Sequence, residues 1–109
     1  MTPPLDWMPT MEHVELRIWP EYYAAVLDGT KRFEVRRDDR DYEVGKMYWM
    51  REWVPPVARC AEGLLGQDDS HYTGRSALVV ISYVLRDVPG LASGYCVWGF
   101  QVLDSQNDL

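Results

Sequence analysis

Three ionisable side chains stand close together in the first third of the chain, at Lys31, Glu34 and Arg36. A lysine can donate to a phosphate or carbonyl oxygen, and a carboxylate can accept a proton or the amino group of a base. The planar guanidinium of Arg36 can hold a phosphate through two parallel hydrogen bonds. The cluster predicts a phosphate-binding site or, with Lys31 and Glu34 as an acid/base pair, a hydrolytic site. The structural alternatives are a surface Lys31–Glu34 ion pair and an Arg36 pairing that holds the rim of the fold.

A short helix and a strand are expected to position this cluster. The residues over 20–28 begin with a proline and place apolar side chains at helical spacing, which predicts a helix. Gly29 supplies the left-handed residue at which a helix commonly ends. In a strand over 32–37, Phe33 and Val35 alternate with charged residues. We expect Phe33 and Val35 to enter the core and the charged face to remain outside.

The other expected strands have alternating or continuous apolar patterns that are bounded by turn residues. They cover residues 13–19, 46–54, 76–87 and 95–103. Residues 77–81 are apolar throughout, which is typical of a central strand that is buried on both faces. Gly99 in the last strand indicates a bulge or a close backbone approach. With one early helix, these strands predict an α+β fold, a small and mostly antiparallel barrel of five to six strands.

One domain over 13–103 is expected, because a chain of 109 residues is long enough for a single core. Residues 1–12 form a Pro-rich extension, expected to be loosely ordered, that lacks the pattern of a signal peptide. Residues 55–71 are expected to form a long loop insertion, and 104–109 a C-terminal tail. No stretch reaches the roughly 18 apolar residues of a membrane span, so we expect a cytoplasmic protein without a membrane partner.

The formal net charge is −6, and an acidic protein is not expected to coat nucleic acid in general. Residues 31–59 nevertheless hold eight of the eleven Lys and Arg residues against six acids, which predicts a local positive patch. The alternative is that the mixed run over 36–43 is a solvated loop whose charges pair with one another.

Neither a metal nor a cofactor is expected. Cys60 and Cys96 form no disulfide framework and no CxxC motif, so two free thiols are predicted. Their spacing from His13 and His71 gives poor support to a zinc site. The chain also lacks a P-loop and a GxGxxG motif.

Several short motifs occur in the same order as in a known group of small domains. They are H-V-E-L-R from His13, G-T-K-R-F-E-V-R from Gly29, D-R-D-Y-E-V-G from Asp39, Y-T-G-R from Tyr72 and G-Y-C-V from Gly94. In these motifs, residues 13–103 resemble the small ASCH-like domains that are common in phages and belong to the PUA-like superfamily. The resemblance implies a barrel of five or six strands whose cleft holds RNA or a nucleotide.

The resemblance also implies two kinds of enzyme. Some relatives deacylate N4-acetylcytidine with a lysine after the glycine turn, a threonine three residues later and a distant glutamate. Lys31 matches the lysine, whereas Glu34 stands at the threonine position. Other relatives have been described as ribonucleases with Lys, Glu and Arg near the cleft.

We therefore expect the cleft to bind single-stranded RNA or a nucleotide, with cations on phosphate, Glu34 on a base edge and one or two aromatic rings stacked on a base. The expected binding residues are His13, Lys31, Glu34, Arg36, Arg40, Tyr42, Trp53, Tyr72, Arg75 and Tyr95. One alternative is a metal-free hydrolase of RNA or a modified nucleoside, in which Lys31 and Glu34 are catalytic and His13 or Tyr95 assists. Another is a phage accessory protein that binds a host protein through 55–71.

Overall fold

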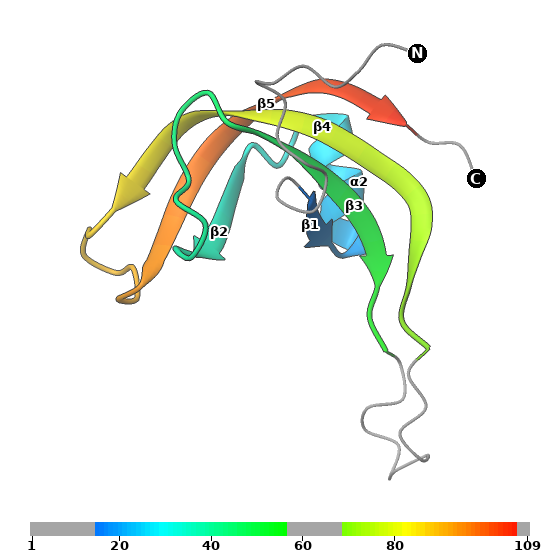
Figure 1. Cartoon of the computed structure of the whole chain (residues 1–109), viewed down its shortest axis with the longest axis horizontal. Coiled ribbons are helices and arrows are strands. Elements are labelled where there is room, and N and C mark those ends of the chain that lie inside the picture. The colour runs from blue at the N-terminus through cyan, green and yellow to red at the C-terminus, as the bar shows by residue number, and fades with distance from the viewer. Residues whose placement is uncertain (1–14, 57–68, 107–109) are drawn as a thin grey trace, which may run out of the picture.

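The computed structural model describes residues 15–56 and 69–106. The elements, in chain order, are β1 (Glu15–Ile18), α2 (Pro20–Asp28), β2 (Phe33–Arg37), β3 (Met47–Val54), β4 (His71–Arg86) and β5 (Tyr95–Gln106). The strands form one five-stranded sheet in the order β1-β3-β4-β5-β2. The long strands β3, β4 and β5 arch into a half-barrel, and β1, β2 and α2 lie beneath the arch (Figure 1). The expectations for 1–12, for His13 and for most of 55–71 fall outside the described residues.

The sheet is mixed. β1 pairs with β3 in parallel, while the β2–β5, β3–β4 and β4–β5 pairs are antiparallel. The chain returns to β1 only after α2 and β2, and a parallel pair needs such a crossover. The α+β class, the single helix and a curled sheet of five strands are therefore confirmed, and the parallel pair is an addition to the predicted pattern.

The helix begins and ends where the sequence predicts. Gly29 closes it with φ 87°, and the N–H of Gly29 bonds back to the carbonyls of Ala25 and Val26. The two longest strands extend beyond their predicted limits. β4 begins at His71, where His71 and Tyr72 pair with β3, and β5 continues to Gln106, because residues 104–106 pair with β4. Residues 104–106 are thus strand and not tail. The β4–β5 register shifts opposite Gly99, between Ile81 and Tyr83, so the additional residue of this irregularity is Ser82 of β4 and not Gly99.

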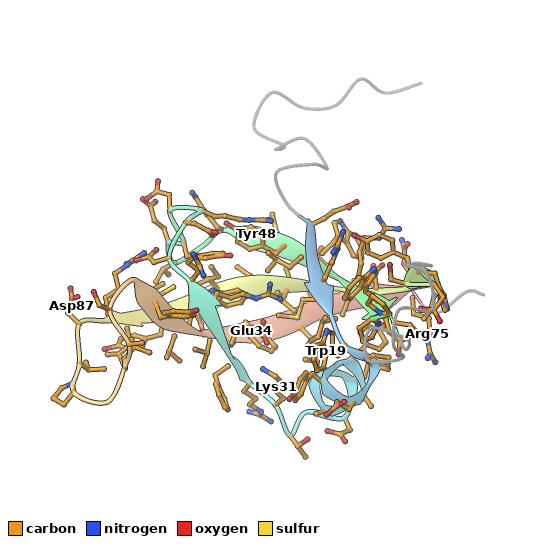
Figure 2. The ribbon with its side chains drawn as sticks, turned by 90° about the horizontal axis from the view of Figure 1, so that it is seen from below. Trp19, Lys31, Glu34, Tyr48, Arg75 and Asp87 are labelled. Atoms are coloured by element: carbon orange, nitrogen blue, oxygen red, sulfur yellow. The ribbon has the colours of Figure 1, made fainter. Side chains whose placement is uncertain are left out.

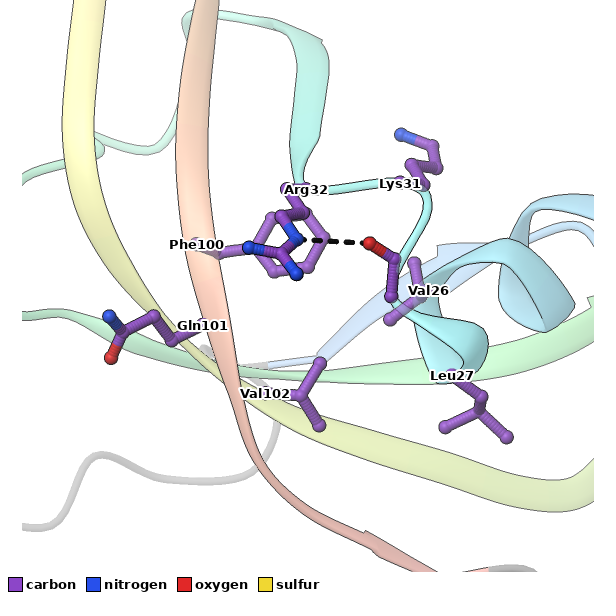
Figure 3. A pocket seen from close by; sticks show the side chains of 8 residues that line it. Val26, Leu27, Lys31, Arg32, Phe100, Gln101 and Val102 are labelled. Carbon is purple, nitrogen blue, oxygen red and sulfur yellow. Dashed lines mark hydrogen bonds between the residues drawn. The ribbon is translucent and has the colours of Figure 1, made fainter.

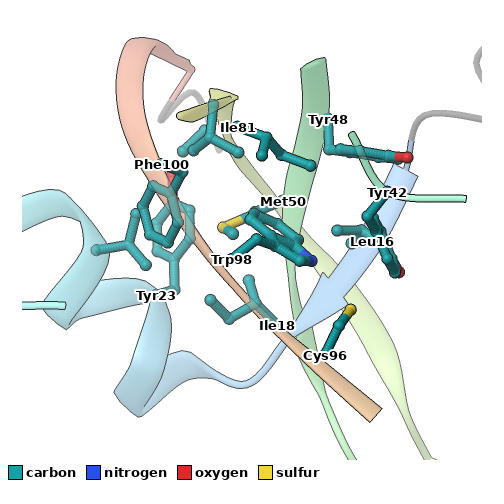
Figure 4. Close-up of a cluster of buried hydrophobic side chains, with 13 residues drawn as sticks. Leu16, Ile18, Tyr23, Tyr42, Tyr48, Met50, Ile81, Cys96, Trp98 and Phe100 are labelled. Atoms are coloured by element: carbon teal, nitrogen blue, oxygen red, sulfur yellow. The ribbon is translucent and has the colours of Figure 1, made fainter. Parts of the chain in front are cut away.

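The core lies on the inner face of the curled sheet, where aromatic rings gather around Trp98. The Trp98 ring centroid lies 5.4 Å from that of Tyr42, 6.0 Å from that of Tyr48 and 5.8 Å from that of Phe100. Tyr23 of α2 closes the core from the helix side (Figure 4). In β4, residues 77, 79 and 81 are buried, whereas residues 78 and 80 on the outer face are only half-buried. The prediction that this segment is buried on both faces was therefore wrong.

The two faces of β2 are the reverse of the prediction. Phe33 and Val35 are 52% and 51% exposed, whereas Glu34 is 6% exposed. Glu34 pairs with Trp98 of β5, so both side chains point into the interior. β2 is an edge strand, and a charge that points inward is one way in which edge strands avoid pairing with other chains.

β1 and β2 stand at opposite ends of the strand order, and arginine side chains join them. The Arg36 Nη2 donates to the Arg17 carbonyl at 2.7 Å. The Arg40 Nη1 donates to the Glu15 carbonyl at 2.8 Å. We call this junction, Arg36 and Arg40 bonded to the carbonyls of Arg17 and Glu15, the seam. The half-barrel is thus bridged by side chains where a closed barrel would have a strand pair.

Candidate functional site

A groove of about 670 Å³ lies beside α2 and β2. Its lining combines cations, exposed aromatic rings and a single carboxylate, that of Glu34. The cations are Arg17, Lys31, Arg36 and Arg37, and the rings belong to Trp19, Tyr22, Phe33 and Tyr95. Figure 2 looks onto this side of the molecule and shows Lys31, Glu34 and Trp19. The predicted cluster is therefore part of a groove that is large enough for a small ligand.

The end of α2 fixes the main chain that carries Lys31. The N–H groups of Thr30 and Lys31 donate to the Ala25 carbonyl at 3.1 and 3.0 Å, which continues the C-cap begun by Gly29. The Asp28 carboxylate accepts from the Thr30 hydroxyl at 2.6 Å and from its N–H at 2.8 Å. These bonds hold the pKa of Asp28 below its usual value. The turn is thus tied to the helix before Lys31 extends from it.

Glu34 receives one cation on each carboxylate oxygen. Lys31 Nζ lies 2.6 Å from its Oε1, and Arg36 Nε lies 2.8 Å from its Oε2. Lys31 also donates to the Phe33 carbonyl, and Arg36 bonds to β1 at the seam. A buried carboxylate with two cationic partners is compensated, and it holds both cations in fixed positions. The two structural pairings considered from sequence are therefore present, and they lie inside the groove.

Exposed rings surround this network. The rings of Trp19 and Tyr22 stack with centroids 6.2 Å apart at the start of α2. Lys31 Nζ lies 5.8 Å from the Tyr22 centroid and 4.9 Å from that of Phe33. The Arg37 guanidinium lies 5.9 Å from the Tyr95 centroid, and both residues line the groove. The groove can thus offer flat apolar surface and positive charge to the same ligand.

Four of the ten predicted binding residues line the groove: Lys31, Glu34, Arg36 and Tyr95. Arg40 serves the seam. Tyr42 is only 1% exposed, so the prediction that its ring stacks on a base is wrong. Its ring packs against Trp98 in the core, and burial raises its pKa to about 12.

Trp53, Tyr72 and Arg75 do not line the groove. Trp53 and Tyr72 are paired in register on β3 and β4, and both contact the Arg17 guanidinium. Arg75 Nε donates to the buried Glu52 at 2.6 Å, beside a separate cavity of about 520 Å³ against α2. Figure 2 places Arg75 well away from Lys31 and Glu34. Burial and the Glu52 charge raise the pKa of Tyr23 in that cavity.

The charged run over 36–43 finds its partners mainly outside itself. Arg36 bonds Glu34, and Arg40 bonds the Glu15 carbonyl. Arg86 of β4 binds the Asp38 carboxylate, which holds the pKa of Asp38 below its usual value, and donates to the Tyr42 carbonyl at 2.7 Å. The alternative of a solvated, self-paired loop is therefore wrong for these residues: the run ties β1, β2 and β4 together.

The sequence did not predict seven of the groove residues: Arg17, Ile18, Trp19, Tyr22, Phe33, Val35 and Arg37. Two local signals could have found some of them. Arg17 alternates with the buried Leu16 and Ile18, so it must face outward. Tyr22 lies off the buried stripe of α2, which contains Tyr23 and Val26.

A smaller cavity of about 230 Å³ lies on the other side of the Lys31 turn. Val26, Leu27, Phe100 and Val102 supply apolar walls, and Arg32 Nε donates to the Gly29 carbonyl at 2.9 Å (Figure 3). Within the described ranges, no three His, Cys, Asp or Glu side chains are grouped to hold a metal ion. In the same part of the chain, no helix has the length and apolar character to cross a membrane.

Comparison with known proteins identifies a family and one protein that is similar over part of its length. Residues 13–100 match the model of a family that is described as "Domain of unknown function (DUF3850)". Over 43 residues the chain is 42% identical to the "Uncharacterized 12.9 kDa protein in GpA 3'region" of Escherichia phage P2. The matched segment spans 39% of this chain and 39% of the phage protein. The similarity thus links the chain to a phage protein over about two-fifths of either length.

Proposed function

The chain belongs to the DUF3850 family, and from that premise we propose that its groove binds a nucleotide or a short single-stranded RNA. The observation that carries the proposal is the lining of the groove. Four cations and four aromatic residues surround one carboxylate, on a chain with a net charge of −6. A ligand that is both anionic and aromatic matches this combination, and nucleotides have both properties.

Each part of a nucleotide has a complementary group in the groove. Arg37 is exposed and makes none of the ion pairs found among the described residues, so its guanidinium is available to phosphate. The exposed rings of Tyr22, Phe33 and Tyr95 offer faces on which a base can stack, at about 1–3 kcal/mol for each base. Glu34 acts by holding Lys31 and Arg36 in place, a different role from the base contact predicted from sequence.

We further infer that the domain is an ASCH-like member of the PUA-like superfamily. Two features support this assignment. The curled sheet with one early helix agrees with a small barrel of that type. The motif from Gly29 to Arg36 begins at the helix stop and brings its Lys and Glu into the groove.

The contacts of Lys31 and Glu34 favour binding over hydrolysis. Both oxygens of Glu34 already accept from cations, and Lys31 donates to Glu34 and to the Phe33 carbonyl. To act as a general base, Glu34 would first have to exchange one of these partners for the substrate. The described residues give no specific support to host-protein binding through 55–71.

Calorimetric titration with nucleoside 5′-monophosphates and a short single-stranded RNA tests the proposal. We expect saturable binding that falls about tenfold in Arg37→Gln, because a charge-assisted contact to phosphate is lost. Tyr22→Ala should weaken binding through lost stacking. Lys46→Gln is the matched control, since Lys46 pairs with Asp41 away from the groove and should bind as wild type does.

The absence of saturable binding in the wild type, or equal affinity in Arg37→Gln and Lys46→Gln, would overturn the groove as the binding site. RNA that is recovered intact after the titration supports a binding role. RNA that is shortened by the wild type but not by Lys31→Gln would instead establish the hydrolase.

A further inference from the structure

A second group of cations and rings lies on the outer side of β1, β3 and β4. We call Arg17, Arg51, Trp53 and Tyr72 the outer cluster. The Arg17 guanidinium lies 4.5 Å from the Trp53 ring centroid, and its Nε donates to the Tyr72 hydroxyl at 3.2 Å. The Arg51 guanidinium lies 3.7 Å from the Tyr72 centroid. Cations and rings therefore alternate in space, although they come from three separate strands.

Arg17 belongs to both the outer cluster and the groove. It lines the groove together with Lys31 and Arg37, and it also contacts Trp53 and Tyr72. Leu16 and Ile18 on either side of it are buried, so the Arg17 side chain leaves β1 on the face opposite the core. The positive surface thus continues from the groove around β1 onto the outer face of the sheet.

We infer that the ligand is a single strand of nucleic acid that leaves the groove past Arg17 and lays its phosphates along the outer cluster. This inference rests on the proposed function of the groove. A lone nucleotide bound in the groove would not reach Arg51, Trp53 and Tyr72, which do not line it. A strand of several nucleotides would use both surfaces.

The contacts within the outer cluster suit phosphate more than bases. The guanidiniums lie 4.5 Å from the Trp53 centroid and 3.7 Å from the Tyr72 centroid, closer than Lys31 and Arg37 lie to the rings of the groove, so these two rings are more closely covered by N–H donors. Contact with a ring holds an arginine in one conformation and lowers the entropy cost of binding. Arg17 makes none of the ion pairs present in the described part of the chain, whereas Arg51 is paired with Glu15 at 3.0 Å. Arg17 therefore supplies most of the uncompensated charge.

The test measures the affinity for ligands of increasing length, in the wild type and in a variant whose substitution lies outside the groove. Uridine 5′-monophosphate and oligouridylates of about three, six and nine nucleotides, with matching DNA oligomers, are titrated at two salt concentrations. We expect affinity to rise with length. Arg51→Gln should weaken oligomer binding severalfold, leave monophosphate binding unchanged and reduce the salt slope by less than about 0.7, because Glu15 already compensates part of the Arg51 charge. Lys46→Gln removes the same charge elsewhere and should have no effect.

Arg51→Lys is a second variant that keeps the charge but loses the planar fork, and it should fall between wild type and Arg51→Gln. Equal affinity for monomer and oligomers, or oligomer binding that Arg51→Gln leaves unchanged, overturns the inference while the groove function stands. Failure of every ligand to bind the wild type overturns the groove function as well. The DNA and RNA arms show whether the strand is recognised through its 2′-hydroxyls.

Discussion

Glu34 determines the arrangement of the groove at the scale of single residues. Its carboxylate lies inside the edge of the half-barrel and bonds Lys31 and Arg36. The sequence predicted the three residues and their proximity, because they follow one another on a short strand. It could not predict which face of that strand is buried. Alternation of apolar and charged residues defines two faces, and on an edge strand the packing of distant elements decides which one points inward.

Replacement of Glu34 tests how much this residue contributes to the stability of the fold. Glu34→Gln removes the charge and leaves Lys31 and Arg36 without their buried counter-ion, so we expect the free energy of unfolding to fall by about 2–4 kcal/mol. Urea denaturation followed by tryptophan fluorescence measures this change. Glu21→Gln is the control, because Glu21 is an exposed acid in the first turn of α2. Its loss should lower the free energy of unfolding by only about 0.3 kcal/mol. Equal midpoints for the two variants would refute this role.

Elements whose ends depend on local chemistry were predicted well. The limits of α2 follow from the proline at its start and Gly29 at its end, and both signals act within a few residues. The ends of β4 and β5 follow from pairing instead. Residues such as Gly74, Asp104 and Ser105 carry little strand preference, and Asp104 and Ser105 are strand because β4 lies beside them. The parallel β1–β3 pair is also non-local, and no spacing in the sequence indicates it.

Two glycines of the chain should respond differently to substitution. Gly29 has φ +87°, where a side chain is strained, so Gly29→Ala should lower the free energy of unfolding by about 1 kcal/mol or more. Gly99 has no positive φ, and an added Cβ would lie 3.5 Å from the Ser82 Oγ and 3.6 Å from the Arg32 carbonyl, which are ordinary contacts. Gly99→Ala should therefore be close to neutral. Thermal unfolding of both variants checks this, and a larger loss at Gly99 would contradict it.

At the scale of the whole molecule, the described core contains three buried tyrosines, Tyr23, Tyr42 and Tyr48. Burial raises the pKa values of Tyr23, Tyr42 and Tyr48, and that of Tyr42 reaches about 12. A raised folded-state pKa means that the folded state holds the proton more firmly than the unfolded state does. The associated stability is complete below the unfolded value of 10.0 and is lost as the pH rises toward about 12.

Alkaline unfolding should therefore depend on Tyr42. The free energy of unfolding of the wild type is expected to fall between pH 10.0 and about 12, with a contribution from Tyr42 of up to about 3 kcal/mol. Tyr42→Phe cannot ionise and should lose less over the same interval, whereas substitution of the exposed Tyr83 by Phe should follow the wild type. Urea denaturation at a series of pH values measures the slopes. Parallel curves for all three proteins would exclude this role of Tyr42.

The distribution of charge was partly visible in the sequence. The excess of Lys and Arg over 31–59 predicted a positive patch, and Lys31, Arg36 and Arg37 do line one groove. Arg17 comes from outside that segment and reaches the groove because β1 and β2 are brought together at the seam. A count along the chain could not include it. Contacts between distant strands thus decide how far the positive surface extends.

The seam has a consequence for the circumference of the half-barrel. In a closed barrel, strand number and shear fix the diameter, since every strand is bonded to two neighbours. Here Arg36 of β2 and Arg40, three residues after the end of β2, bond to carbonyls of β1 through their side chains. Loss of both hydrogen bonds would free the two edges from each other while every ladder of the sheet stays intact. The distance between these two edges of the sheet is thus set by two side-chain hydrogen bonds and not by a strand ladder.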